Sequence, residues 1–231
     1  MKIFVTGMGV ISALGKTTSE NLSALQSATS GIKMGSSQRK KCYLGSAPID
    51  DTEIRAKFNL NQEALAPRTA LLGLWAADQA LVNIDSAERQ KTAFINGTTT
   101  GGMDLSERYF QKALKTDQHD LLYTLKSHDL GATTSFIQET LGLEGYANTI
   151  STACSSAANA IMLGARMIQA GQVDRVLVGG TDALTHFTID GFGSLMIYDN
   201  NECRPFDHQR TGLNLGEGAG YFLLESEATA P

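Results

Sequence analysis

The stretch Thr149–Ala160 reads TISTACSSAANA, and it sets the fold expected for the residues around it. A short β-branched run ends at Thr152 and predicts the end of a strand. The small residues after it predict a helix that continues to about Ala170, where a glycine follows. Cys154 is therefore expected at a strand-to-helix corner, on the first turn of a buried central helix.

A cysteine at a helix start is in a position to act as a nucleophile. The unpaired backbone N–H groups and the positive end of the helix dipole favour thiolate over thiol. The same N–H groups can hold the oxyanion that forms in acyl transfer. A lone cysteine in an apolar run is otherwise an inert small hydrophobe. The residues alone leave both interpretations of Cys154 open.

The rest of the chain alternates strand and helix patterns. Strands are expected at 2–6, 92–96, 175–179 and 221–225, and helices at 18–28, 67–82, 103–115 and 133–141. Leu22 and Leu25 are expected on the inner face of the first helix, and Trp75 in the core. Residues 29–52 are polar and predict a loop with at most a short strand at 43–47. No linker composition divides the chain, so we expect one α/β domain over 1–231, with a mixed sheet between helices.

Two glycine-rich segments invite nucleotide-binding interpretations. Gly7-Met8-Gly9 follows a strand, but Ser12 stands where a dinucleotide-binding motif has its third glycine, so we reject that assignment. Residues 97–102 read GTTTGG, and they lack the lysine of a phosphate-binding P-loop. Their place after a strand favours a structural turn beside a ligand site.

Composition excludes several classes of protein. The net charge is −5 and no basic run exceeds Arg39-Lys40-Lys41, which argues against nucleic-acid binding. No apolar stretch approaches the roughly 20 residues that a membrane span needs. The three cysteines show no CxxC spacing, which argues against a disulfide framework and a zinc site. We therefore expect a cytoplasmic protein without a bound cofactor.

Four motifs occur in the order of a known family. They are TACSSA at 152–157, DRVLVGGTDA at 174–183, RPFD at 204–207 and GLNLGEGAG at 212–220. Together they resemble the N-terminal half of a β-ketoacyl-acyl-carrier-protein synthase, an elongating condensing enzyme of the thiolase-like superfamily. The resemblance runs from KIFVTGMGVISALG at 2–15 to the strand that ends at Glu225, so it covers the whole chain. It implies a thiolase-like layered α/β unit, the N-terminal half of a duplicated fold, in which Gly9 and Gly15 shape a loop.

The resemblance also implies a reaction and a set of site residues. Cys154 would carry the growing acyl chain as a thioester, and malonyl-acyl-carrier protein would lose CO2 and attack it in a decarboxylative Claisen condensation. Residues 192–198 are expected to pack over the site. The residues expected to support it are Thr152, Ala153, Ser155, Arg204, Phe206, Asp207 and Glu217. Arg204 and Asp207 are expected to pin neighbouring segments by ion pairing, and Glu217 to be a buried, partnered carboxylate.

The resemblance further implies partners. Family members stabilise the reaction's oxyanions with two histidines and a glycine-rich loop from a C-terminal half. The histidines of this chain all lie in other contexts: His119, His128, His186 and His208. We therefore expect a second half, in cis or in trans, together with an acyl carrier protein and a second copy of the chain in a homodimer. His128 lies where the sequence departs from the usual family pattern, and we expect it at the surface or the pocket rim.

Two alternatives remain at this stage. One is a non-catalytic acyl-binding or scaffolding subunit, like the partner chains of the family that lack the nucleophile; Cys154 argues against it. The other is a thiolase or an initiating synthase, and the RPFD and GEGAG motifs favour the elongating type instead.

Overall fold

The computed structural model describes residues 2–36, 41–61, 64–116 and 119–230. Arg39 and Lys40 of the basic run lie outside these residues. The elements in chain order are β1 (Ile3–Ser12), α1 (Thr18–Gln26), β2 (Lys33–Ser36), β3 (Lys41–Gly45), α2 (Asp51–Lys57), α3 (Arg68–Ala80), α4 (Ser86–Lys91), β4 (Ala93–Gly97), α5 (Met103–Thr116), η1 (Leu122–Ser127), α6 (Leu130–Leu141), β5 (Ala147–Ile150), α7 (Ser156–Gln169), β6 (Arg175–Asp182), α8 (His186–Ser194), β7 (Leu215–Gly216) and β8 (Gly218–Ser226).

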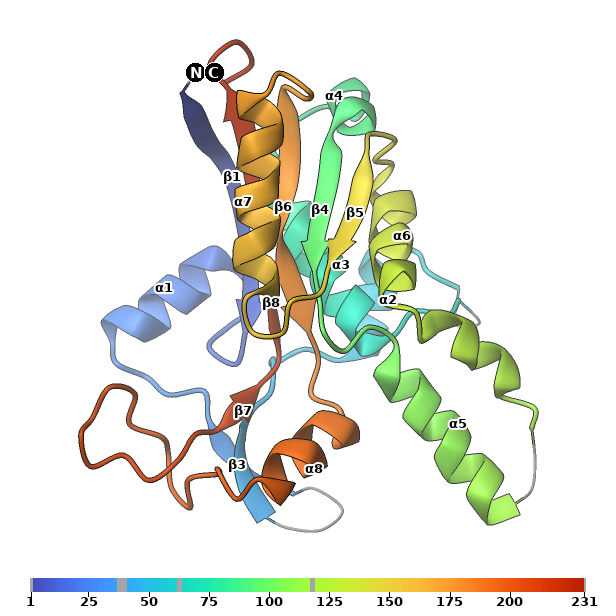
Figure 1. Ribbon diagram of the computed structural model, residues 1–231, viewed down its shortest axis with the longest axis vertical. Coiled ribbons are helices and arrows are strands. Elements are labelled where there is room, and N and C mark those ends of the chain that lie inside the picture. Colours follow the sequence, from blue (N-terminus) through green and yellow to red (C-terminus); the bar gives the residue numbers. More distant parts are fainter. Residues whose placement is uncertain (1, 37–40, 62–63, 117–118, 231) are drawn as a thin grey trace.

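A five-stranded mixed sheet forms the centre of the structure (Figure 1), with strand order β1-β8-β6-β4-β5. β6, β4 and β5 are parallel, and β8 pairs antiparallel with both β6 and β1. α7 packs on one face of the sheet, and α3 on the other with α6 beside it. The expected fold class, an α/β unit with a mixed sheet between helices, is confirmed.

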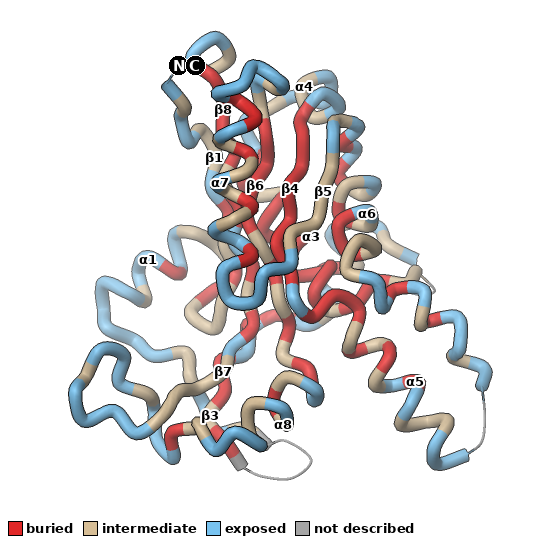
Figure 2. Tube along the Cα trace, viewed as in Figure 1, coloured by how far each residue is buried: buried red, intermediate tan, exposed pale blue. Residues whose placement is uncertain are grey.

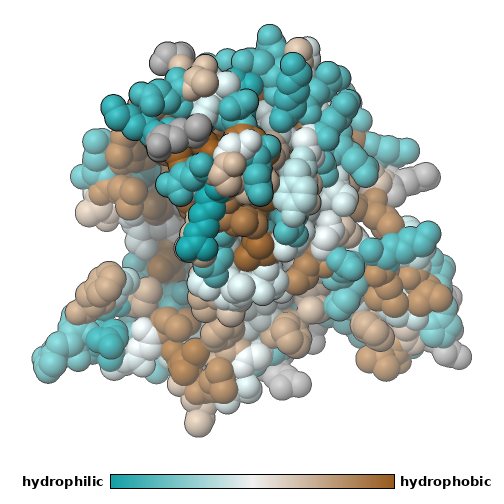
Figure 3. Space-filling model, turned by 45° about the horizontal axis from the view of Figure 1, so that its top comes forward, coloured by the Kyte–Doolittle hydropathy of each residue, from teal (hydrophilic) through white to brown (hydrophobic). Residues whose placement is uncertain are grey.

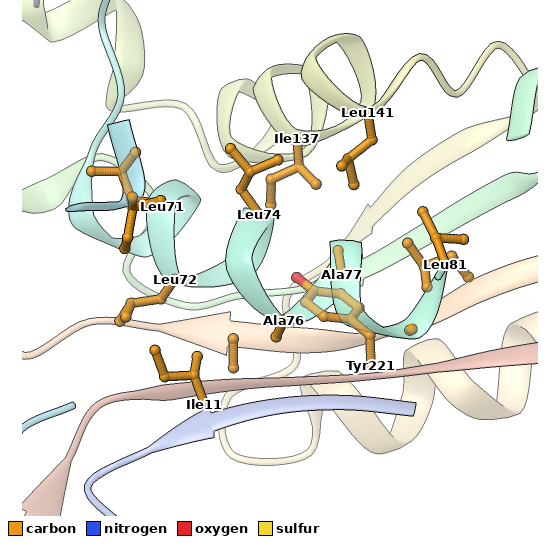
Figure 4. Close-up of a cluster of buried hydrophobic side chains, with 14 of the residues drawn as sticks. Ile11, Leu71, Leu72, Leu74, Ala76, Ala77, Leu81, Ile137, Leu141 and Tyr221 are labelled. Carbon is orange, nitrogen blue, oxygen red and sulfur yellow. The ribbon is translucent and has the colours of Figure 1, made fainter. Parts of the chain in front are cut away.

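The larger core lies between the sheet and α3. Nine of the thirteen residues of α3 are buried, as expected for a helix that is apolar on almost all sides. Buried segments concentrate in the central strands and in this helix (Figure 2). Leu72, Leu74 and Ile137 meet the sheet residues Ile11 and Tyr221 in this core (Figure 4). A smaller cluster, which includes Ile95, Ala160 and Val178, lies under α7.

β1 differs from the expectation in length and burial. It continues to Ser12, so Gly9 lies within it, whereas Gly15, the other glycine expected to shape a loop, lies in the turn that follows. A Cβ atom at Gly7 or Gly9 would lie 2.0 or 1.9 Å from a carbonyl oxygen of α3, so the glycines let α3 pack directly on the strand backbone. The strand is also at the sheet edge, and Val5 and Met8 are about half exposed.

Two expectations about side-chain burial also need correction. Leu22 and Leu25 do not face inward, since they are 54% and 66% exposed. Asn21 is the buried residue of α1, and its Nδ2 donates to the carbonyl oxygens of Gly15 and Thr17. Trp75 is half-buried at the edge of the larger core, where its Nε1 donates to the Lys16 carbonyl.

The segment expected to be mostly loop contains more regular structure. β2 and β3 pair with each other, and β3 pairs with β7 in a second, three-stranded sheet. The short helices α2 and α4 were also not foreseen. None of the helices in the described part of the chain combines the length and the apolar character that a membrane span requires.

The start of α7 packs against the backbone of β4 and β6 at two glycines. A Cβ atom at Gly97 would lie 2.7 Å from the backbone nitrogen of Ala157, and one at Gly180 would lie 2.9 Å from the Ala157 Cβ. Both glycines are close to the carboxyl ends of their strands. Their lack of a side chain therefore allows α7 to begin directly over this end of the sheet.

We predict that Gly97→Ala lowers the free energy of unfolding by about 1–3 kcal/mol, because an added methyl group would overlap the α7 backbone. Gly191→Ala is the matched control. Gly191 lies within α8 with no atom within 4 Å of an added Cβ, so helix propensity should make this change neutral or slightly stabilising. Urea denaturation measures both. Equal effects of the two substitutions would contradict the packing of α7 on β4.

Candidate active site

Cys154 lies on the short turn between β5 and α7. The helix begins at Ser156, so the cysteine precedes its first residue by two positions and is not on its first turn as expected. The cause is Ala153, which adopts a left-handed φ of +54° that interrupts the helical path. This conformation is unfavourable for a residue with a side chain, and residues held in it cluster at functional sites.

Hydroxyl groups hold this strained turn in place. Ser156 is buried, and its Oγ donates to the Ala153 carbonyl at 2.7 Å and accepts from the Thr152 N–H at 2.9 Å. Ser155 Oγ donates to the Thr152 carbonyl at 2.7 Å. Asn159 Nδ2 donates to Thr152 Oγ1, also at 2.7 Å. Thr152, Ala153 and Ser155 therefore all belong to the turn that presents Cys154.

The same hydrogen bonds limit what the turn itself offers to an oxyanion. The backbone N–H of Ser155 donates to the Thr152 carbonyl at 3.4 Å, and that of Ser156 donates to the Ala153 carbonyl at 3.1 Å. Two of the N–H groups expected to be open at the helix start are therefore engaged within the turn. The Cys154 thiol, in contrast, is exposed and free of any disulfide.

A cavity of about 640 Å³ opens beside Cys154. The ends of β4 and β6 contribute Gly97 and Gly180 to it, which fits the general placement of ligand sites at the carboxyl ends of parallel strands. Apolar side chains from several elements form much of its wall: Met103, Leu184, Phe187, Phe192, Leu195 and Leu215. The apolar segment expected over the site is thus present, although its helix, α8, begins at His186 and ends at Ser194.

Asp182 is a residue of the cavity wall that the sequence analysis missed. Its carboxylate accepts five hydrogen bonds from the turn Thr98–Thr100, two from backbone N–H groups and three from hydroxyls, at 2.7–3.0 Å. Asp182 ends β6 and the threonines follow β4, and these strands are parallel neighbours. The glycine- and threonine-rich segment is therefore a structural turn at the cavity, held by a carboxylate that the linear sequence does not connect to it.

Glu217 is buried and partnered, as the resemblance implies. Its two oxygens accept from Arg68 Nη2 at 2.6 Å and Nε at 3.3 Å, and from the backbone N–H groups of Ala47 and Leu184. Burial on its own lowers the pKa of Arg68. The hydrogen bonds and charges of Glu217 and Asp51 outweigh burial, and the pKa lies above its ordinary value. Because Leu184 also lines the cavity, Glu217 joins one wall of the site to α3 and to the loop after β3.

The RPFD loop does not reach the cavity. Arg204 pairs with Asp207 of the same loop at 3.5 Å, and its Nη2 donates to the Gln209 carbonyl. Within the described part of the chain, neither residue forms the expected ion pair with a neighbouring segment. Phe206 is fully exposed with a φ of +64°. None of these three lines the cavity beside Cys154.

The histidines also lie away from the cavity, since none is among the described residues that line it. His128 is exposed, and its Nδ1 lies 2.9 Å from Ser106 Oγ. The Nδ1 of His119 lies 3.0 Å from the hydroxyl of Tyr109. Both contacts connect α5 to the segment that follows it.

We predict that Glu217→Gln lowers the free energy of unfolding by about 3 kcal/mol, because it leaves the half-buried charge of Arg68 without its main partner. The matched control is Glu53→Gln. Glu53 pairs with Lys16 at 2.7 Å, but both side chains are substantially exposed, so its loss should cost no more than about 1 kcal/mol. Thermal or denaturant unfolding of the two variants provides the comparison. Similar losses would show that the Glu217 junction is no more important than a surface ion pair.

Comparison with known proteins identifies relatives of this chain. The chain is 29% identical to nodulation protein E of Rhizobium meliloti over 97% of its own length and 58% of that protein. It is 26% identical to 3-oxoacyl-[acyl-carrier-protein] synthase 2 of Staphylococcus aureus, of which it covers 59%. The ketosynthase ApeO of Xenorhabdus doucetiae, solved with its chain length factor, superposes with a TM-score of 0.81 at 30% identity over 97% of this chain and 58% of that one.

The chain thus spans somewhat less than three fifths of these relatives. Another solved structure, the ishigamide ketosynthase/chain length factor, shares the fold with a TM-score of 0.89 at 24% identity, over 99% of this chain and 59% of that one. The family model of the β-ketoacyl synthase N-terminal domain matches residues 1–230. On this evidence the chain belongs to the β-ketoacyl synthase family of condensing enzymes, whose N-terminal domain it matches.

Proposed function

We propose that this chain is the nucleophile-bearing half of a β-ketoacyl-acyl-carrier-protein synthase. The observation that carries the proposal is the placement of Cys154, which is exposed on a strained turn at the mouth of a cavity with a largely apolar wall. Such a cavity suits an acyl chain, and the exposed thiol suits attack on a thioester brought by an acyl carrier protein.

The reaction has two stages. Cys154 Sγ, as thiolate, attacks the carbonyl of the acyl thioester, and the thiol of the carrier protein leaves. Malonyl-acyl-carrier protein then loses CO2, its carbanion attacks the Cys154 thioester, and the Cys154 thiolate is released as the β-ketoacyl product forms. Both stages pass through oxyanions that need hydrogen-bond donors.

The cavity supplies few such donors by itself. No histidine is among its described lining residues, and the N–H groups of Ser155 and Ser156 are engaged in the turn. We therefore assign the donors for condensation to a second half of the protein, contributed in cis or in trans. A non-catalytic scaffolding role is the weaker candidate, because it gives no reason for an exposed cysteine on a turn held by several hydroxyl groups.

We assign the packing of this second half to an apolar face that the described residues leave uncovered. Val5 and Met8 of β1 pair with Leu224 and Phe222, which lie in or against the cluster under α7, yet Val5 and Met8 are 56% and 49% exposed. Met162 is 44% exposed on α7, a helix that contacts β1. Figure 3, in which the top of the molecule is turned forward, shows hydrophobic surface between hydrophilic residues. A second α/β layer over α7 would remove this surface from water.

We expect residues 1–231 to accept an acyl group on Cys154 but to form no ketoacyl product. The absence of a single oxyanion donor costs on the order of 10²–10³ in rate. The resemblance implies two histidine donors for condensation, and no histidine is among the described residues that line this cavity. The protein is incubated first with a carrier protein that bears an acyl group and then with one that bears a malonyl group. Peptide mass mapping detects the acyl group on Cys154, and product analysis detects any ketoacyl product. The Cys203→Ala variant should become acylated to the same extent as the wild type, and the Cys154→Ala variant should not become acylated.

Two results would count against the proposal. Acylation that persists in Cys154→Ala would place the nucleophile elsewhere. Robust, Cys154-dependent formation of product by residues 1–231 would show that donors within this chain suffice and that no second half is needed.

We also propose that two copies, or one copy and a related chain, pair through the open edge of β5. Tyr146 and Ile150 accept hydrogen bonds from β4, so the alternating backbone groups of Ala147 and Thr149 point toward the open edge. The Thr149 N–H donates to Asn148 Oδ1 at 2.8 Å, and this side chain would have to give way to a pairing strand. An exposed edge of this kind favours association with another strand. ApeO and its chain length factor give an example of a related ketosynthase in a two-chain complex. We place the assembled enzyme in the cytoplasm, consistent with three free cysteines.

We predict a dimer at micromolar concentration and a monomer for Ala147→Pro. Proline is tolerated as the first residue of an edge strand, but it removes the outward N–H and so blocks pairing beyond β5. Analytical ultracentrifugation gives the mass, and far-UV circular dichroism checks that the variant stays folded. A wild-type monomer, or a dimer that survives the substitution, would contradict pairing through this edge.

A further inference from the structure

A row of hydrogen-bonded polar side chains crosses the larger core. The Tyr221 hydroxyl donates to Asn96 Oδ1 at 2.7 Å, and Asn96 Nδ2 donates to Thr134 Oγ1 at 3.1 Å. Thr134 Oγ1 lies 2.6 Å from Thr149 Oγ1. Tyr221 and Asn96 are 1% and 0% exposed, and Thr134 is 4% exposed. The row therefore begins in the apolar centre and ends at the edge strand β5.

The strand register brings these residues together. Tyr221 of β8 pairs with Gly179 of β6, Gly179 pairs with Asn96 of β4, and Asn96 pairs with Thr149 of β5. A Cβ atom at Gly179 would lie 2.7 Å from Tyr221 Cδ1, so the missing side chain lets the tyrosine ring lie across β6 toward Asn96. Figure 4 shows this ring among the apolar side chains of the core.

The hydrogen bonds of the row all run in one direction, from Tyr221 toward Thr149. Burial, followed by the charge of Asp182, raises the pKa of Tyr221 well above its ordinary value, so its hydroxyl keeps its proton and donates. Asn96 then accepts through its oxygen and donates through its nitrogen. Thr134 Oγ1 accepts from Asn96, which leaves its own proton for Thr149 Oγ1.

The register of the edge strand β5 has to be fixed by something other than the burial of its apolar residues. β5 has only four residues, Ala-Asn-Thr-Ile, all half-buried, and it pairs with β4 alone. Its sequence does not alternate apolar and polar residues, so burial specifies its register weakly. A slip of one residue would turn Asn148 toward the core in place of Thr149 and remove the Thr149 hydroxyl from the buried hydroxyl of Thr134. Buried polar groups left unpaired are costly, so the row selects one register.

We infer that the row from Tyr221 through Asn96 and Thr134 to Thr149 fixes the register of β5 and thereby positions the Cys154 turn, which begins directly after Ile150. Asn96 and Thr134 are then positioning residues for acyl transfer. None of the four residues of the row lines the cavity, so each acts on Cys154 only through the strand. The link to acyl transfer rests on the proposed function, whereas the link to β5 does not.

The chain offers a closely matched set of variants. Thr134→Val removes the bridging hydroxyl with little change in shape, and Thr134→Ser keeps it. Thr133→Val is the control, because the neighbouring Thr133 is equally buried on α6, and its hydroxyl has no partner among the described residues. Tyr221→Phe removes the hydroxyl at the other end of the row. It tests the same row without a change in α6, whose packing Thr134→Val could disturb.

Native-state hydrogen exchange gives the first measurement. Thr134→Val and Tyr221→Phe should raise exchange of the β5 amides and of residues 151–155 by about tenfold relative to the amides of β6, while Thr134→Ser and Thr133→Val should leave that ratio unchanged. A uniform increase over the whole sheet, or no change at β5, would overturn the inference. So would Thr133→Val reproducing the effect of Thr134→Val.

The rate of Cys154 acylation by an acyl-carrier protein gives the second measurement. It should fall in Thr134→Val and recover in Thr134→Ser, in parallel with exchange at β5. An unchanged acylation rate despite faster exchange would overturn the positioning role for Asn96 and Thr134. If wild-type Cys154 accepts no acyl group, the proposed function fails, and the exchange data still decide whether the row holds β5.

Discussion

The contact between the first turn of α7 and the backbones of β4 and β6 determines the geometry of the whole site. Gly97 and Gly180 leave room for Ala157, so the helix starts directly above the carboxyl ends of the parallel strands. Ala153 must then adopt a left-handed backbone to connect β5 to that start, and Ser156 stabilises the resulting turn. These contacts leave Cys154 exposed beside the cavity. Its exposure does not come from a position within α7, because the helix begins two residues later.

Two carboxylates complete the walls around that turn. Asp182 holds the Thr98–Thr100 turn on one side, and Glu217 joins Leu184 to Arg68 and Ala47 on another. Both accept from backbone N–H groups of segments distant in sequence, so they fix main-chain positions as well as side chains. Both junctions hold main-chain segments of the wall in place, and the apolar part of the wall on α8 is the part that the proposed function assigns to an acyl chain.

The sequence predicts those elements of the fold that depend on local pattern. The β-branched run before Cys154, the small residues after it and the apolar runs of β4, β6 and β8 all predicted their elements and their order. Gly9 was expected in a loop, as the resemblance implies, but it lies within β1, where the missing side chain lets a helix approach the strand backbone. Leu22 and Leu25 misled because helical spacing indicates an apolar stripe without showing what covers it. The threonines that bond Asp182 lie more than 80 residues away from it, and Glu217 lies 149 residues away from Arg68, so the linear sequence does not show these contacts.

The central claim is that an acyl chain on Cys154 enters the cavity between α8 and the ends of β4 and β6. Its most direct test is a crystal structure of the protein alkylated on Cys154 with an iodoacetamide that carries a long N-alkyl chain. The account predicts that the alkyl chain lies along Phe187, Phe192 and Leu195, with Asp182 and the Thr98–Thr100 turn unmoved. An alkyl chain that lies along the open face of α7, outside the cavity, would contradict it.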